Sequence, residues 1–256
     1  MFTKAIVRLP SANFAAGLTS VDIGTPDHAQ VLEQHEAYCA ALKHCGLTLF
    51  RLEADPHYPD STFVEDTAVL TERCAILTRP GAPSRAGEVE VISEVLSLFY
   101  PSILGIQLPG TLDGGDVCQA GEHFFIGVSA RTNQSGAQQL ADRLALFDYT
   151  SSFVDIRDIS GILHLKSGLA YLSDNRLVVV DALAKREEFR SYDLVRVRVE
   201  DEYAANCVLI NDYVLVAARH PAIEEKLQAL GHKTIVLNVS EFQKMDGGLS
   251  CLSLRL

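Results

Sequence analysis

The sequence predicts an α/β fold built from a repeated unit. Short strands rich in β-branched residues alternate with amphipathic helical segments along the whole chain. A small or polar cluster stands before a pair of strands in each of several similar segments. Comparable positions in these units lie 50, 50, 40 and 44 residues apart: Asp66, Asp116, Lys166, Asn206 and Ser250. Repeats of this length are typical of propellers, solenoids and other arrays.

Each of the first four units has two strands joined by a short turn, followed by a helical segment. The strand pairs lie in FVEDTAVLTERCAILTRPG, LDGGDVCQAGEHFFIGVSA, LHLKSGLAYLSDNRLVVVDA and YAANCVLINDYVLVAARHP. Helices are expected over residues 84–100, 132–147, 184–191 and 221–230, and the third has the weakest periodicity.

The fifth unit, DGGLSCLSLRL, can be completed by a strand at residues 2–9 and a helix at 26–45. Five such units suggest a ring with the strands towards its axis and the helices outside. An N-terminal strand that closes the last unit would leave no long sheet edge exposed. We therefore expect a single domain over residues 1–256, and the alternative architecture is a two-domain open α/β sheet.

Two of the predicted helices have a clear apolar face. In the segment 84–100 this face is formed by Val89, Ile92, Val95, Leu96 and Phe99. In the segment 26–45 it is formed by Leu32, His35, Tyr38, Cys39 and Leu42. Pro26 suits the first turn of that helix and Gly46 suits its end.

Composition excludes several classes of partner. The net charge is −11, from 22 basic and 33 acidic side chains, which disfavours binding to nucleic acid or to an anionic membrane. No apolar run has the length of a membrane span. The start, MFTKAIVRLP, is typical of a short strand and lacks the long apolar region of a signal peptide. We expect a cytoplasmic protein whose partner is a small molecule, and the sequence leaves a homodimer open.

The six cysteines are expected to be reduced thiols. No pair has C-x-x-C spacing, so a zinc knuckle is not indicated. Without a secretion signal, three disulfides are the weaker interpretation. Most free cysteines are small buried apolar residues, and five of these six are expected to be so.

Cys251 and His164 are the candidate nucleophile and acid–base catalyst. Cys251 follows Gly247 and Gly248, and two glycines let the backbone bend or approach a ligand closely. His164 shares one strand face with Lys166 inside the apolar run GILHLKSG. Each residue alone also fits a purely structural role. Brought together at the centre of a ring, they favour nucleophilic and acid–base catalysis.

Acidic residues open the first two units and would face the same axis: Asp60, Glu65, Asp66, Asp113 and Asp116. Asp66 lies in an otherwise apolar strand, where an unpaired carboxylate would cost several kcal/mol. A cationic ligand would supply the missing partner. Asp113 and Asp116 flank Gly114 and Gly115, a pattern that is also typical of an ordinary turn.

Arg85 and Arg131 each follow a strand and precede a helix. Taken singly, each is expected to be a solvated surface residue. Together they could clamp a carboxylate, because the planar guanidinium fork matches it with two hydrogen bonds.

Seven motifs in this order resemble those of the dimethylarginine dimethylaminohydrolases. They are YPDSTFVEDTAVL (58–70), LTRPGAPSR (77–85), PGTLDGGDV (109–117), ARTNQSGAQQ (130–139), LHLKSGLAYL (163–172), YAANC (203–207) and MDGGLSCLSL (245–254). The resemblance runs from GLTS (17–20) to the last residue. It implies the pentein fold of the guanidine-modifying superfamily, a five-bladed α/β propeller of ββαβ-type repeats around a central substrate channel.

The resemblance also implies the activity: hydrolysis of Nω-methylated arginine to citrulline and a methylamine, without a metal or cofactor. It makes Cys251 the nucleophile, His164 the general acid and base, and Asp113 its acidic partner, where some bacterial relatives have glutamate. The remaining contacts are Asp66 with Glu65 for the guanidinium, Arg85 and Arg131 for the α-carboxylate, Asp60 and the carbonyls of Leu18 and Met245 for the α-amino group, and Phe63 for the methylene chain.

Three other functions fit parts of the sequence. Arginine deiminases resemble this family in fold and nucleophile but are longer and carry an extra helical insertion. Non-catalytic propellers, such as ribosome anti-association factors, need no cysteine, histidine and acid together, and the charge of −11 disfavours ribosomal RNA. A papain-like protease would place its cysteine near the mature N-terminus rather than at position 251.

Overall fold

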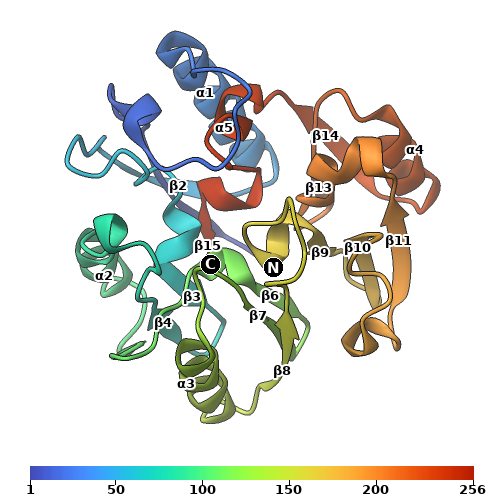
Figure 1. The fold of residues 1–256 in the computed structure, drawn as a ribbon. Helices are drawn as coiled ribbons and strands as arrows, with labels where there is room; N and C mark the ends of the chain where they lie inside the picture. Colours follow the sequence, from blue (N-terminus) through green and yellow to red (C-terminus); the bar gives the residue numbers. More distant parts are fainter.

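The computed structural model describes residues 1–256 and contains five separate three-stranded sheets. Figure 1 shows these sheets around a common centre, with the longer helices towards the outside. The single open sheet of the alternative architecture is not observed. None of the helices is long and apolar enough to span a lipid bilayer.

All five sheets share one topology. The first strand is antiparallel to the second, and the second is parallel to the third. Four sheets consist of consecutive strands: β3 (Ala68–Leu70), β4 (Ala75–Leu77) and β5 (Ile103–Gly105); β6 (Val117–Ala120), β7 (His123–Val128) and β8 (Thr150–Asp155); β9 (Leu169–Tyr171), β10 (Arg176–Val180) and β11 (Asp193–Val197); β12 (Val208–Ile210), β13 (Tyr213–Ala217) and β14 (Lys233–Leu237).

The fifth sheet joins the two ends of the chain. Its first strand is β15 (Leu254–Arg255), its second is β1 (Lys4–Arg8) and its third is β2 (Thr48–Leu52). The backbone N–H of Thr3 donates to the carbonyl of Leu256 over 2.8 Å, and the two termini lie side by side near the centre of Figure 1.

A helical segment connects the second and third strands of each sheet, as a parallel crossover requires. These segments are α1 (His28–His44), α2 (Glu88–Leu96), α3 (Gln134–Ala145), the 3₁₀ turn η6 (Glu187–Phe189) and α4 (Pro221–Ala229). The Asp27 carboxylate caps α1 by accepting from the N–H of Gln30, and Asn133 caps α3 in the same way. A short further helix, α5 (Ser240–Gln243), follows β14.

The helix predictions were correct in type for four segments and wrong for one. The segment 184–191 forms only the turn η6, because Phe189 is its one large buried side chain and a single anchor cannot dock a longer helix. The segment 84–100 is helical only over Glu88–Leu96, after the separate 3₁₀ turn η3 (Pro83–Arg85). In α1, Val31 is buried where Leu32 was expected, and Leu32 is exposed.

One 3₁₀ turn stands before the strand pair of each unit. These turns are η2 (Val64–Thr67), η4 (Gly114–Asp116), η5 (Leu165–Ser167), η7 (Val199–Ala205) and η8 (Ser250–Leu252). The turn η2 contacts both η4 and η8, η4 contacts η5, and η5 contacts η7. The polar clusters of five distant segments therefore meet at the centre, while four apolar clusters fill the space between sheets and helices.

Candidate active site

A cavity of about 340 Å³, including the part open to solvent, lies at this meeting point. It is lined by Leu18, Asp60, Phe63, Asp66, Arg85, Arg131, Leu163, His164, Met245, Asp246, Gly247 and Cys251. Nine of these were predicted from the sequence.

His164 and Asp113 form a buried pair beside the cavity. The ring Nε2 of His164 lies 3.0 Å from Oδ2 of Asp113, and Asp113 is fully buried. The other oxygen of Asp113 accepts from the N–H of Gly81 over 2.8 Å, which fixes the carboxylate in place. Burial alone would lower the pKa of His164, but the charges of Asp66, Asp113 and Asp116 raise it to about 9. The imidazole is therefore protonated at neutral pH.

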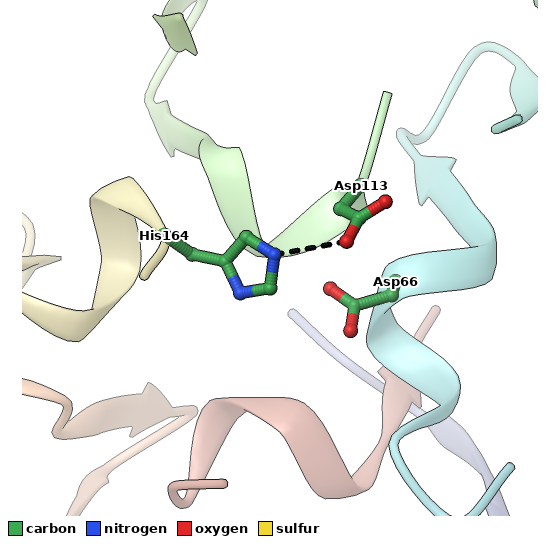
Figure 2. A group of neighbouring side chains, drawn as sticks. All are labelled: Asp66, Asp113 and His164. Atoms are coloured by element: carbon green, nitrogen blue, oxygen red, sulfur yellow. Dashed lines mark hydrogen bonds and ion pairs between the residues drawn. The ribbon is translucent and has the colours of Figure 1, made fainter. Parts of the chain in front are cut away.

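Asp66 lies beside Asp113 and faces the same side of the imidazole (Figure 2). Its Oδ1 accepts from the N–H of Gly115 over 2.9 Å, and its Oδ2 accepts from Nη1 of Arg85 over 2.6 Å. Burial would raise the pKa of Asp66, but the positive charges of His164 and Arg85 hold it below its usual range. A side chain at Gly115 would lie 2.8 Å from the His164 ring, so only glycine permits this approach.

Asp66, Asp113 and His164 also form the one group of side chains with donors arranged as for a metal ion. Their donor atoms lie within 4.8 Å of one another. Figure 2 shows the three side chains together. All three are already engaged with one another, with Arg85 or with backbone amides.

Cys251 is the only cysteine that is not buried. It lies in η8, and its Sγ accepts from the N–H of Gly248 at 3.4 Å. Burial of the sulfur and the negative charges of Glu65 and Asp66 raise the pKa of the thiol well above its ordinary value. Without a bound cation, the site therefore holds a neutral thiol.

The two arginines differ in how many donors they keep free. Arg85 is buried, and its guanidinium donates to Asp66, to the carbonyl of Phe63 and, through Nε and Nη2, to Glu88. Arg131 makes no ion pair or side-chain hydrogen bond in the structure, although it lines the same cavity. The two arginines were expected to clamp a carboxylate with two free guanidinium groups. Only the guanidinium of Arg131 and one remaining N–H of Arg85 are free to do so.

Glu65 and Asp116 lie outside the lining of this cavity. Glu65 accepts from Nζ of Lys166 at 2.7 Å, from Arg255 at 3.0 Å and from the Ser250 hydroxyl at 2.8 Å. All four of these residues line a second and larger cavity. The expected place of Glu65 beside the substrate guanidinium is therefore not supported by its contacts. Asp116 accepts from Ser129, Thr132 and the N–H of Leu165, which is a structural role.

The remaining predicted residues form the mouth and one wall of the cavity. The Asp60 carboxylate accepts from the N–H of Leu18 at 3.0 and 3.1 Å. Phe63 packs edge-on against Phe14 and Phe242, which holds its ring at the wall.

Sequence reasoning missed three lining residues, Leu163, Asp246 and Gly247. Asp246 has a positive φ of 58° and accepts from the N–H of Ser20. A signal for it was present, since Asp246 directly precedes Gly247 and Gly248, the two glycines expected to let the backbone bend or approach a ligand.

Comparison with known proteins places the chain among the guanidine-modifying enzymes. The model of the family described as arginine deiminase matches residues 50–206. The chain is 44% identical over 256 residues to the N(G),N(G)-dimethylarginine dimethylaminohydrolase of Pseudomonas aeruginosa, with all of both chains covered. The chain belongs to the dimethylarginine dimethylaminohydrolase family. The family's enzyme from Streptomyces coelicolor is 36% identical, with 99% of this chain and 96% of that one covered.

Solved structures of this dimethylarginine dimethylaminohydrolase family agree in fold over the whole chain. The Pseudomonas aeruginosa enzyme, as a cysteine-to-serine variant complexed with citrulline, matches with a TM-score of 0.97 and 43% identity over 100% of both chains. A histidine-to-glycine variant that carries an S-methyl-L-thiocitrulline adduct also has a TM-score of 0.97. The N-terminal domain of ArgZ, a cyanobacterial arginine dihydrolase, is 18% identical with a TM-score of 0.88, which shows a shared fold alone.

Proposed function

We propose that the protein hydrolyses Nω-methylated arginine to citrulline and a methylamine, with Cys251 as the nucleophile. The observation that carries this proposal is one cavity lined by a thiol, a protonated imidazole and a buried carboxylate, with a second carboxylate bound to the imidazole. The full-length similarity to dimethylarginine dimethylaminohydrolases supports the same substrate class.

The charges of the cavity suit the two ends of an arginine derivative. Asp66, which lines the cavity, would hold the guanidinium and keep its charge, which leaves its central carbon electrophilic, while Asp113 stays bound to His164. Arg131 would bind the α-carboxylate, with the one spare N–H of Arg85 as a second donor. Asp60 and the carbonyls of Leu18 and Met245 would bind the α-amino group, and Phe63 would pack against the methylene chain.

The substrate cation would activate the nucleophile. Two carboxylates near Cys251 hold its thiol neutral, and a bound guanidinium would offset their charge and lower the thiol pKa. The resulting thiolate attacks the guanidinium carbon and forms a carbon–sulfur bond.

His164 is suited to both proton transfers that follow. The tetrahedral adduct collapses when the C–N bond breaks and protonated His164 gives its proton to the departing dimethylamine. The neutral imidazole then takes a proton from water, and the hydroxide attacks the thiouronium carbon. Breaking of the carbon–sulfur bond returns the thiolate and releases citrulline.

We further infer a single five-bladed α/β propeller over residues 1–256, in a reducing compartment such as the cytoplasm. Five sheets of one topology, and a fifth sheet that joins the first and last strands, support the propeller. Six unpaired cysteines support the compartment.

An arginine deiminase is the second candidate, because the matching family model carries that description. That match ends at residue 206, before Cys251, whereas the similarity to dimethylarginine dimethylaminohydrolases covers the whole chain.

Product analysis separates the two functions. Incubation with Nω,Nω-dimethylarginine should yield citrulline and dimethylamine in equal amounts, and Cys251→Ser should yield neither. Release of ammonia from unmethylated arginine at a higher kcat/KM, with dimethylarginine left intact, would establish the deiminase instead.

A further inference from the structure

Hydrogen bonds link the 3₁₀ turns of neighbouring units around the centre. In the first unit, Oδ1 of Asp66 accepts from the N–H of Gly115 over 2.9 Å. In the second, Oδ1 of Asp116 accepts from the N–H of Leu165 over 3.0 Å. In both cases a carboxylate on one turn binds a backbone amide at the next turn.

Asn206, in the fourth unit, makes the corresponding links to the turns of both neighbouring units, the third and the fifth. Its Nδ2 donates to the carbonyl of Lys166 over 2.8 Å and to the hydroxyl of Ser250 over 2.9 Å. Its Oδ1 accepts from the N–H of Ser250 over 2.9 Å. The Ser250 hydroxyl in turn donates to Glu65 in the first unit, so the chain of hydrogen bonds closes on itself.

These links place Asn206 between the two turns that carry the chemistry. Lys166 lies two residues after His164 in the chain, and Ser250 directly precedes Cys251. Asn206 is 7% exposed and does not line the substrate cavity. It therefore contacts the segments that bear the imidazole and the sulfur without lining the cavity that would hold the substrate.

Asn206 also sets the shape of the turn around the sulfur. A Cβ atom on Gly248 would lie 2.5 Å from Oδ1 of Asn206, so the amide packs directly on this glycine. The N–H of Gly248 donates to Sγ of Cys251 at 3.4 Å, and the N–H of Cys251 donates to the carbonyl of Gly248 at 3.2 Å. Removal of the amide would release the turn that aims the thiol.

We propose that Asn206 is a positioning residue that holds the Cys251 turn in register with the His164 turn. An amide is required because this position binds a carbonyl on one side and an N–H on the other, which a carboxylate cannot do. The assignment rests on the proposed function for its effect on turnover, but the hydrogen bonds it explains are independent of the substrate.

Loss of this residue should lower kcat and leave KM nearly unchanged. A displacement of about 1 Å between reacting groups can reduce the rate about 100-fold. Substrate binding should persist, because the residues that line the cavity are not those bound by Asn206. The alignment of Gly248 with the sulfur should also be lost, which removes a donor that stabilises the thiolate.

The test compares Asn206→Ala with wild type and with Asn211→Ala. Asn211 is a matched control: it also makes three side-chain hydrogen bonds between separate segments, to Phe2 twice and to Cys45, and it does not line the cavity. Steady-state kinetics with dimethylarginine are measured on folded protein. Labelling of Cys251 by iodoacetamide is followed by mass spectrometry across pH, which needs no turnover.

Asn206→Ala should lower kcat at least 10-fold with KM within about two-fold, and should move the labelling midpoint to higher pH. Asn211→Ala should lose thermal stability while kcat and labelling stay unchanged. If Asn206→Ala fails to fold, the same measurements are made on Asn206→Asp, which keeps the shape and the acceptor. Its kcat and labelling midpoint should lie between those of wild type and those expected for Asn206→Ala.

Unchanged kcat and labelling in a folded Asn206 variant would overturn the proposal, and so would equal losses in the Asn211 control. Failure of both Asn206 variants to fold, with Asn211→Ala folded, would assign Asn206 to general stability and also refute it. If wild type does not consume methylated arginine, the proposed function fails, while the labelling comparison still decides the role of Asn206.

Discussion

At the scale of single residues, opposed charges set the protonation of the site. His164 is protonated because three aspartates surround it, and Cys251 is neutral because carboxylates and burial disfavour its thiolate. The two residues therefore differ from a preformed thiolate–imidazolium pair in one respect. The imidazole is charged, but the sulfur keeps its proton until a cation binds.

Titration of the Cys251 thiol should show this dependence on ligand. Without ligand, the ultraviolet absorbance of the thiolate should appear only well above pH 8.5, the usual midpoint of a cysteine. Addition of arginine as a cationic ligand should move the midpoint down, because its guanidinium would bind in the cavity that Cys251 and Asp66 line and offset the nearby negative charge. Cys251→Ser is the control, and a free enzyme already ionised near pH 7 would rule out activation by the substrate.

Replacement of Asp113 by asparagine should shift the basic limb of the pH–rate profile. Protonated His164 is lost in wild type as the pH rises through about 9. Loss of the Asp113 charge lowers that pKa towards the ordinary 6.5, so kcat/KM for dimethylarginine should fall at lower pH.

The same substitution gives a stability test of the pair. A folded pKa above the unfolded value adds stability that is fully present below pH 6.5 and is lost as the pH rises through about 9. The difference in unfolding free energy between wild type and Asp113→Asn should therefore shrink across that window. A difference that grew with pH would contradict protonation of His164 in the folded state.

At the scale of elements, helix caps fix where the peripheral helices begin. The Asp27 carboxylate accepts from the N–H of Gln30 at the start of α1, and Asp27 does not line the cavity. Asp27→Ala should lower the free energy of unfolding by about 1 kcal/mol, measured in urea, with kcat unchanged. Asp27→Asn keeps an acceptor and should retain most of the stability. Equal loss in both variants would mean that the cap is not the cause.

Sequence reasoning was most successful for elements with strong local signals. The helical periodicity of apolar residues predicted α1, α3 and α4 to within a few residues, with Pro26 and Gly46 as further signals for α1. The segment 184–191 was misjudged because charged residues with one apolar anchor resemble a weak helix in sequence, and only tertiary packing decides the outcome.

The site was predictable in its members but less so in their contacts. Cys251, His164 and Asp66 line the cavity as expected, and Asp113 binds the imidazole. The ion pairs of Glu65 with Lys166 and Arg255 join residues up to 190 positions apart, and they engage this carboxylate outside the lining of the substrate cavity. Charge pairing over such separations leaves no local pattern in a sequence.

At the scale of the whole molecule, closure depends on both ends of the chain. Strand β1 is the middle strand of the fifth sheet, and β15 pairs with its edge. Both Cys251 and the hydrogen bonds of Ser250 lie next to this sheet in sequence. The pairing of β15 with β1 therefore also fixes the end of the segment that carries Cys251.

A circular permutant should test this closure. Linking residue 256 to residue 1 through a short glycine linker, with new ends at the exposed turn Gly231–His232, should preserve the fold and keep kcat within about three-fold. Deletion of residues 1–9 should instead abolish cooperative thermal unfolding, because it removes the middle strand. Loss of structure in the permutant together with a folded deletion variant would show that the ends are not coupled.

The neutral sulfur has a consequence for survival in an oxidising or electrophile-rich environment. Peroxides and electrophiles react with thiolates, so an idle molecule offers them little to attack: five thiols are buried and the sixth keeps its proton. Vulnerability should begin when a cationic ligand occupies the pocket. Inactivation by hydrogen peroxide should accordingly be faster in the ligand-bound protein than in the free protein.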